Sequence, residues 1–173
     1  MKLLLSIHKY DVFMFTWLVN ANLNKTFTTI SRYFSKSGDG YLYVPIAALL
    51  FLTEGAQSPL LNAIVFAFLL ERPIYFVLKN SFKRNRPEAA LTNFQSTIKP
   101  SDQFSFPSGH SSAAFMMATL LGYFFPSFIA PLYLWAASVA CSRVVLGVHF
   151  PTDILVGSVL GMGIALLSLG YMI

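Results

Sequence analysis

Long apolar stretches separated by short polar segments make up most of the chain. Several of them approach the roughly 20 residues that a helix needs to cross the hydrocarbon core of a membrane. These stretches cover residues 41–53, 60–78, 108–125, 131–146 and 152–173. The pattern therefore predicts an all-α fold, a polytopic bundle of membrane helices.

The N-terminal third is less regular than the rest of the chain. Residues 11–19 are apolar and aromatic but too few to span a membrane. In residues 26–36, apolar side chains recur at helical spacing beside Arg32 and Lys36. This spacing indicates an amphipathic helix at the membrane interface or packed obliquely in it. We expect about six helices in all, and the number of spans in residues 1–40 stays open.

Individual residues inside the apolar stretches carry further predictions. Pro73 is expected to kink the helix of residues 60–78, and Glu71 and Arg72 are expected to form ion pairs inside the bundle. Residues 79–105 are polar and read as one long loop. Small residues in the last stretch permit close helix packing, and they are Gly157, Gly161 and Gly163.

Composition narrows the class of protein. Hydrophobic residues make up 55% of the 173 residues, charged residues make up 11%, and the mean hydropathy is +0.62. A soluble globular protein does not have this composition. The net charge is +5, but the chain lacks the broad basic face of a nucleic-acid binder. No nucleic acid is therefore expected as a partner. Residues 1–173 are expected to form a single domain, with the one cysteine, Cys141, buried in it.

If each long apolar stretch crosses the membrane once, three polar clusters lie at the same membrane face. One helix runs up to Lys79, the next runs away from His110, the third returns to Arg143, and the last departs near Asp153. Ionisable groups are costly in hydrocarbon, so clustered ones at a membrane face indicate a functional site.

The cations of these clusters suit a phosphate group. Lys79, Arg86 and Arg143 offer a point charge and two planar forks that match phosphate oxygens. Ser108 and Gly109 stand at a helix start, where free backbone N–H groups favour an anion. We expect these five residues to bind phosphate. For each basic residue taken alone, an interfacial side chain among lipid headgroups is the ordinary alternative.

The histidines of the clusters suit covalent catalysis. His149 lies four residues before Asp153, so a helix starting between them would hold the carboxylate near the ring and leave one ring nitrogen as a nucleophile. His110 is a second histidine, available to protonate a leaving oxygen. The sequence offers neither a carboxylate cluster for magnesium nor ligand spacing for zinc, so we expect no metal and no other cofactor.

These three clusters resemble the three-part signature of the type 2 phosphatidic acid phosphatase (PAP2) superfamily. The matching segments are Lys79-x6-Arg86-Pro87, Pro107-Ser108-Gly109-His110 and Ser142-Arg143-x5-His149-x3-Asp153. The resemblance implies an integral-membrane lipid phosphatase that works without metal. It also implies that His149 forms a phosphohistidine, that Asp153 orients His149, and that His110 is the general acid.

We therefore expect a membrane phosphatase that hydrolyses a phosphate monoester or diphosphate of a lipid. Phosphatidylglycerophosphate, phosphatidate and undecaprenyl diphosphate all fit, and membrane lipids are the expected surroundings. We expect it in a bacterial inner (plasma) membrane with the active site facing outward, although the distribution of Lys and Arg alone would place that face in the cytoplasm. The alternative is a non-catalytic protein that binds or transports a lipid phosphate.

Overall fold

The computed structural model describes residues 2–20, 25–100 and 102–172, and within these ranges the regular structure is entirely helical. The elements in chain order are α1 (Lys2–Asn20), α2 (Lys25–Ser37), α3 (Tyr43–Glu54), η1 (Gly55–Gln57), α4 (Pro59–Phe82), α5 (Pro87–Ala90), α6 (Gly109–Phe124), η2 (Pro126–Phe128), α7 (Ile129–Val145) and α8 (Pro151–Met172). The all-α prediction is therefore confirmed.

Two of the long helices begin at capping serines. The side chain of Ser58 accepts a hydrogen bond from the backbone N–H of Leu61 at 3.3 Å, and Pro59 occupies the first helical position of α4. The side chain of Ser108 accepts one from the backbone N–H of Ser111 at 3.4 Å, so α6 starts at Gly109. Both arrangements satisfy N–H groups that have no partner within the helix.

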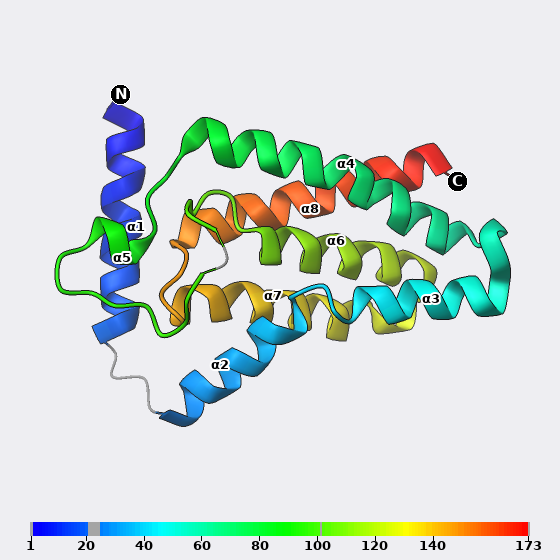
Figure 1. Cartoon of the computed structure of the whole chain (residues 1–173), viewed down its shortest axis with the longest axis horizontal. Helices are drawn as coiled ribbons and strands as arrows, with labels where there is room; N and C mark the ends of the chain where they lie inside the picture. Colours follow the sequence, from blue (N-terminus) through cyan, green and yellow to red (C-terminus); the bar gives the residue numbers. More distant parts are fainter. Residues whose placement is uncertain (1, 21–24, 101, 173) are drawn as a thin grey trace.

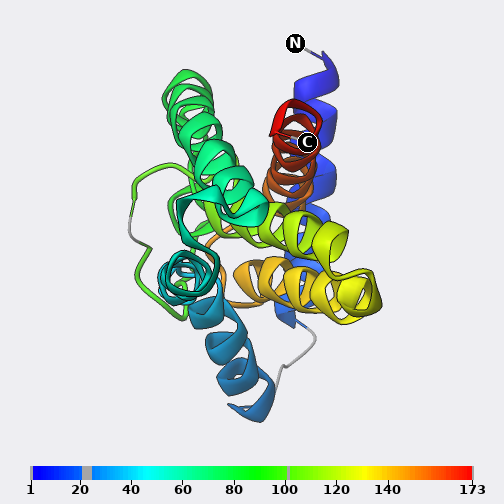
Figure 2. The ribbon, with the colours of Figure 1, turned by 90° about the vertical axis from the view of Figure 1, so that its right-hand side faces the viewer.

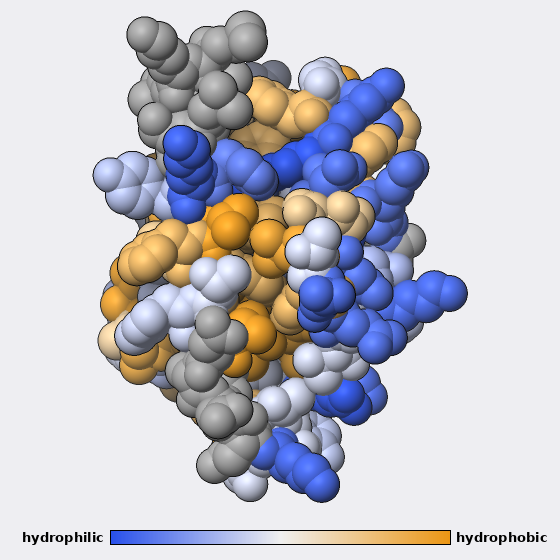
Figure 3. Space-filling view, turned by 90° about the vertical axis from the view of Figure 1, so that its left-hand side faces the viewer, coloured by the Kyte–Doolittle hydropathy of each residue, from blue (hydrophilic) through white to orange (hydrophobic). Residues whose placement is uncertain are grey.

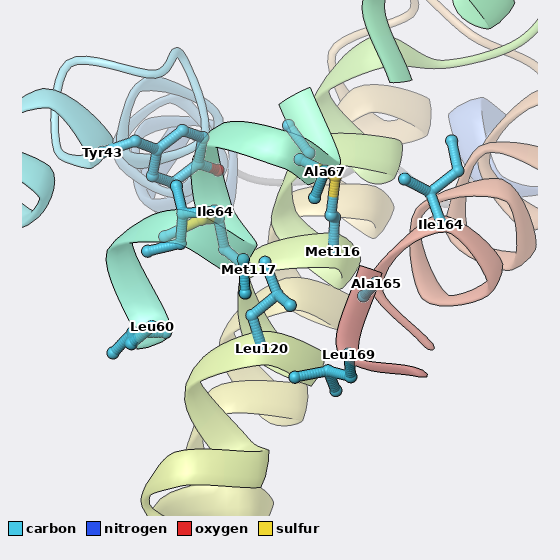
Figure 4. Close-up of a cluster of buried hydrophobic side chains, with 12 residues drawn as sticks. Tyr43, Leu60, Ile64, Ala67, Met116, Met117, Leu120, Ile164, Ala165 and Leu169 are labelled. Carbon is cyan, nitrogen blue, oxygen red and sulfur yellow. The ribbon is translucent and has the colours of Figure 1, made fainter. Parts of the chain in front are cut away.

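Helix α6 lies at the centre of the bundle, with α4, α7 and α8 running alongside it (Figures 1 and 2). Ten of its 16 residues are buried, which is the pattern of a helix covered on nearly all sides. Apolar side chains from α3, α4, α6 and α8 meet in one cluster, which includes Tyr43, Ile64, Met116, Leu120 and Ile164 (Figure 4).

Two glycines explain how closely α8 approaches α6. A Cβ atom on Gly161 would lie 2.0 Å from the carbonyl oxygen of Ser112, and one on Gly157 would lie 2.5 Å from that of Ser108. The prediction that these residues permit close packing is confirmed for both. It is wrong for Gly163, because no atom lies within 4 Å of its Cβ position. Gly163 stands two residues beyond Gly161 and so falls on another side of the helix.

Three helical stretches within the described residues are long and apolar enough to cross a membrane. They are Pro59–Ala90, Pro126–Val145 and Pro151–Met172. Exposed apolar side chains such as Leu155, Val159 and Leu166 cover the outside of α8, as expected where lipid replaces water. The chain is an integral membrane protein.

The two N-terminal helices differ from the long helices in direction or in polarity. Helix α1 runs across one end of the bundle instead of along it (Figure 1). It exposes Tyr10, Phe13 and Trp17 and buries Asp11 and Phe15. Helix α2 packs on α7, where it buries Ser31 and Ser35, and it exposes apolar side chains such as Ile30 and Tyr33. A helix at the predicted residues 26–36 is confirmed with slightly wider bounds.

Several predicted details change in the structure. The helix predicted for residues 60–78 runs through Pro73 to Phe82, so Lys79 lies in the last turn of α4 and not in a loop. Lys83 caps the end of the helix, with a φ of 45° in the left-handed region. Glu71 is buried and pairs with Arg72, as predicted. Cys141 is exposed and not buried, because α7 turns this side of the helix away from the bundle.

Candidate active site

The three polar clusters converge at one end of the bundle. The last turn of α4, the first turn of α6, the end of α7 and the start of α8 lie together there, on the left in Figure 1. Seen from that end, hydrophilic side chains gather along one side of the surface, next to an apolar area (Figure 3). A cavity of about 290 Å³ opens among these elements, and we call it the phosphate cavity. Its lining includes Lys79, Arg86, Gly109, His110, Arg143 and His149.

His149 lies in the short segment between α7 and α8 and is 2% exposed. Its Nδ1 atom lies 3.6 Å from Oδ2 of Asp153, beyond hydrogen-bond distance, and its Nε2 atom lies 3.5 Å from Nη1 of Arg86. Burial lowers the pKa of the His149 imidazole to about 4; the Asp153 carboxylate opposes this shift and Arg86 adds to it. The ring is therefore neutral at pH 7, as a nitrogen nucleophile must be.

Asp153 is fixed by groups from three parts of the chain. Its Oδ2 atom accepts a hydrogen bond from the backbone N–H of Phe150 at 2.8 Å, and its Oδ1 atom accepts one from Nη1 of Arg84 at 2.7 Å. Arg84 also pairs with Asp11 of α1 at 2.6 Å, and the backbone N–H of Thr152 donates to Asp11 at 3.0 Å. A chain of charges thus runs from Asp11 through Arg84 to Asp153 and stops beside His149.

A carboxylate bridges two of the predicted phosphate-binding residues. Oδ2 of Asp102 lies 2.5 Å from Nζ of Lys79 and accepts a hydrogen bond from Tyr75 Oη at 2.8 Å, and Oδ1 pairs with Nη2 of Arg86. Burial raises the pKa of the Asp102 carboxyl, but the bonds and charges of Lys79, Tyr75 and Arg86 outweigh it and lower the pKa to about 2. Asp102 therefore stands as an anion where these donors converge.

Tyr75 also explains the glycine of the second cluster. A Cβ atom on Gly109 would lie 3.0 Å from Cε2 of Tyr75, so the ring packs directly on the backbone at the start of α6. The Nζ atom of Lys79 lies 4.6 Å from the centroid of the same ring. Gly109 thus permits a close approach to the start of α6, and the neighbour that fills the space is Tyr75.

Arg143 is the third predicted cation and is 4% exposed. Its Nη1 atom donates to the Oγ atom of Ser35 at 2.5 Å, which ties α7 to α2. Its Nε atom has no hydrogen-bond partner within the described residues. A buried guanidinium with a free N–H is able to take an additional acceptor such as a phosphate oxygen.

His110 faces the cavity from the first turn of α6. Its Nε2 atom lies 2.5 Å from Oδ1 of Asp39, in the turn between α2 and α3. The carboxylate can only accept, so Nε2 carries the proton in this pair. A substrate oxygen placed where Asp39 lies would accept that same N–H, which is the geometry of a proton donor.

Ser108, like Asp153, is a predicted site residue that does not line the phosphate cavity. It is fully buried, and its Oγ atom accepts from the hydroxyl of Ser111 at 2.9 Å as well as from the Ser111 backbone. Its backbone N–H donates to the carbonyl of Asp153 at 3.0 Å. Ser108 holds the start of α6 against the start of α8 and so positions Gly109 and His110.

Within the described residues, no three His, Cys, Asp or Glu side chains gather in a way that could hold a metal ion. Cations surround the cavity instead. The arrangement can bind a phosphate group, present a neutral imidazole to its phosphorus atom and offer a proton from the other side.

Five residues of the site escaped prediction. Asp11 carried a signal, because a carboxylate alone in an apolar helix requires a partner. Arg84 lies within the polar loop predicted for residues 79–105, where no local pattern distinguishes it from Arg86. Nothing local marked Tyr75, Asp39 and Asp102, because their partners lie far away along the chain.

Known proteins are similar to this chain over most of its length. The family model described as PAP2 superfamily matches residues 59–172. The chain is 29% identical over 158 residues to an undecaprenyl-diphosphatase of Sulfolobus acidocaldarius, covering 87% of this chain and 73% of the relative. It is 34% identical over 160 residues to phosphatidylglycerophosphatase B of Bacillus subtilis, covering 86% and 75%.

Solved structures show the same architecture. The crystal structure of Aquifex aeolicus LpxE is similar with a TM-score of 0.81 and 30% identity, over 91% of this chain and 93% of that one. A transmembrane PAP2-type phosphatidylglycerolphosphate phosphatase from Bacillus subtilis is similar with a TM-score of 0.79 and 25% identity, over 96% and 86%.

Proposed function

The chain belongs to the PAP2 superfamily, and on this premise we propose that it is a membrane phosphatase that hydrolyses a phosphate monoester or diphosphate of a lipid. The relatives named above are phosphatases of lipid phosphates, which supports the reaction class. Phosphatidylglycerophosphate, phosphatidate and undecaprenyl diphosphate are the candidate substrates. We propose that the whole chain, residues 1–173, acts as a single domain.

One observation carries the proposal. His149 is buried, with Nδ1 toward Asp153 and Nε2 toward Arg86 and the phosphate cavity. Asp153 is fully buried, and its carboxylate accepts hydrogen bonds from the backbone N–H of Phe150 and from Arg84. This environment favours the tautomer with the proton on Nδ1 and the lone pair on Nε2, which is the form that attacks phosphorus.

The first half of the proposed reaction transfers the phosphoryl group to His149. The lone pair of Nε2 forms a bond to phosphorus, and the bond between phosphorus and the lipid oxygen breaks. His110 donates a proton to that oxygen, so the lipid leaves as a neutral alcohol, or as a lipid monophosphate when the substrate is a diphosphate. Lys79, Arg86 and Arg143 balance the charge on the other phosphate oxygens.

The second half returns the enzyme to its starting state. A water molecule attacks phosphorus, neutral His110 accepts one of its protons, and the bond between phosphorus and Nε2 breaks. Inorganic phosphate leaves, and the protonation states of both histidines are restored. Asp153 stabilises the charge that His149 carries in the phosphorylated state.

We propose that no metal takes part, because the three cations provide the charge that a metal supplies in other phosphatases. We also propose that the active site faces outward from a bacterial inner membrane. This assignment follows the orientation that is usual in the family. The distribution of Lys and Arg is a poor guide to orientation here, because the cations of the site have a chemical role in binding phosphate.

Phosphate release from a lipid phosphate by the purified protein in detergent tests the function. We expect turnover to persist in excess EDTA, and orthovanadate to inhibit by occupying the phosphate cavity. A strict need for added magnesium would contradict metal independence. A non-catalytic carrier would instead bind the lipid and release no phosphate, and His149→Asn would leave its binding unchanged.

A further inference from the structure

A second, larger cavity adjoins the phosphate cavity. It has a volume of about 710 Å³ and lies between α2 and the loop before α6. Asp39, His110 and Arg143 line both cavities, so the two spaces meet at these residues. We call the larger space the outer cavity.

Cations dominate the charged residues of the outer cavity. Arg32 and Lys36 come from α2, and Lys99 comes from the facing loop. Arg143 adds a fourth cation at the boundary with the phosphate cavity. Asp39 is the carboxylate among the described lining residues, and its Oδ1 atom is bound to His110. A group that binds in the outer cavity therefore meets an excess of positive charge.

The wall that carries these cations is held in place. The Nη2 atom of Arg32 donates to the carbonyl of Thr97 at 3.1 Å, which joins α2 to the loop that holds Lys99. Ser35 lies between Arg32 and Lys36 in the sequence and binds Arg143 at 2.5 Å. Residues three and four apart share one side of a helix, so Arg32, Ser35 and Lys36 all face the same space.

The boundary residues indicate which part of a substrate occupies the outer cavity. Asp39 stands where an oxygen would accept the proton of His110, and in the proposed reaction this is the leaving oxygen. Asp39 also lines the outer cavity, so a group attached to that oxygen extends into it. An apolar groove along α3 and α4 shares Tyr43 and Arg72 with the phosphate cavity, but His110 is not part of its lining.

We propose that the outer cavity is a second anion site, which binds a phosphate group in the leaving part of the substrate. This inference rests on the proposed function and names its substrate class. A phosphodiester linked through glycerol to the reacting phosphate fits, as in phosphatidylglycerophosphate, and so does the second phosphate of a polyprenyl diphosphate. Phosphatidate is disfavoured because its leaving group, a diacylglycerol, carries no charge.

Two matched pairs of substrates test the second anion site in neutral detergent micelles. The first pair is phosphatidylglycerophosphate and phosphatidate with the same acyl chains, and the second is farnesyl diphosphate and farnesyl monophosphate. In the wild type we expect higher kcat/KM for the member of each pair with two phosphate groups. The pair with the larger preference shows which separation between the two phosphate groups fits the two cavities.

The triple variant Arg32→Gln, Lys36→Gln, Lys99→Gln removes the cations of the outer cavity. Exposed charges contribute modestly, so the expected loss in kcat/KM on the two-phosphate substrates is about tenfold, with the one-phosphate substrates within about twofold of wild type. The matched control is Lys9→Gln, Lys25→Gln, Lys83→Gln, which removes the same charge from exposed residues outside both cavities. It should keep the wild-type preference.

Each outcome decides between hypotheses. Equal losses on all four substrates, or an equal effect of the control variant, would overturn the second anion site and assign these cations to general charge or to folding. Retention of the two-phosphate preference in the triple variant would also overturn it. Phosphate release from none of the four substrates by the wild type would overturn the proposed function itself. The charge-conserving variant Arg32→Lys, Lys36→Arg, Lys99→Arg should keep the preference.

Discussion

At the residue scale, the two histidines of the phosphate cavity differ in burial and in the carboxylate that each one faces. His149 is 2% exposed and faces Asp153, which is fixed by Arg84. His110 is less buried and faces Asp39 in an exposed turn. In the proposed mechanism, His149 is the neutral nucleophile and His110 is the proton donor, so their replacements should have different consequences.

Replacing each histidine separates the two roles through the leaving group. His110→Ala should lose about 100-fold or more in kcat on a lipid phosphate monoester, because the alkoxide needs a proton to leave. It should keep substantial activity on p-nitrophenyl phosphate, whose nitrophenolate leaves without help. His149→Ala should be inactive on both substrates. Equal losses on both substrates for His110→Ala would instead assign His110 to phosphate binding.

The buried state of His149 has a measurable titration. With a pKa of about 4, its imidazole stays neutral as the pH falls from 7 and becomes protonated only as the pH passes through about 4. We expect one histidine in the ¹⁵N spectrum of histidine-labelled protein to titrate in that range, and its signal to disappear in His149→Gln. Titration of this signal near 6.5, the value of a solvent-exposed imidazole, would show that the ring is not desolvated.

In the proposed mechanism, Asp102 competes with the substrate phosphate for the same donors. Its carboxylate engages Tyr75, Lys79 and Arg86, which a phosphate dianion would also use. Asp102→Asn should therefore tighten inhibition by orthovanadate, by about tenfold, as one negative charge leaves the site. Glu88→Gln is the matched control, because Glu88 is an exposed carboxylate in the same segment between α4 and α6 and accepts a hydrogen bond from Ser96. Weaker inhibition in Asp102→Asn would show that Asp102 mainly positions the two cations.

At the scale of elements, α1 reaches the catalytic machinery through Arg84. Arg84 does not line the phosphate cavity, so it acts as a positioning residue through Asp153. Arg84→Gln should lower kcat about tenfold and leave KM nearly unchanged, and it should raise the pH at which His149 titrates because a nearby positive charge is lost. Arg84→Lys should restore part of kcat, and the neighbouring Lys83→Gln should behave as wild type. An unchanged titration of His149 would mean that Arg84 serves only the fold.

The contact between α6 and α8 is tested by two glycines of one helix. Gly161→Ala brings a Cβ atom to 2.0 Å from a backbone carbonyl of α6, so the helices must separate. We expect a destabilisation of about 1–3 kcal/mol and a fall in Tm of several degrees in detergent. Gly163→Ala, which meets no atom within 4 Å, should leave Tm unchanged or raise it. Equal Tm values for the two variants would contradict the packing described here.

At the scale of the whole molecule, the sequence predicts the helices and their convergence for a physical reason. Hydrophobic stretches of membrane length leave few ways to place the polar segments, so Lys79, His110 and His149 had to meet at one face. The end of α4 was placed too early because Lys79 is polar, although a buried lysine with partners continues the helix well.

Contacts between distant segments are the part that sequence patterns do not contain. The pairing of Asp11 with Arg84 joins residues 73 positions apart and connects α1, which crosses the end of the bundle, to the segment after α4. The same holds for the carboxylates that engage Lys79 and His110. Helical periodicity predicts which side of a helix is apolar, but it does not predict which of two arginines in a loop pairs with which aspartate.

The phosphate cavity opens at the end of the spanning helices, at the level where lipid headgroups lie. In the proposed function, a lipid phosphate approaches the cavity by lateral diffusion within one leaflet, and encounter takes place in two dimensions. The quantity that sets the rate is then the mole fraction of substrate among the surrounding lipids, not its concentration in the bulk solution. Phosphatases built this way respond to the composition of the bilayer that surrounds them.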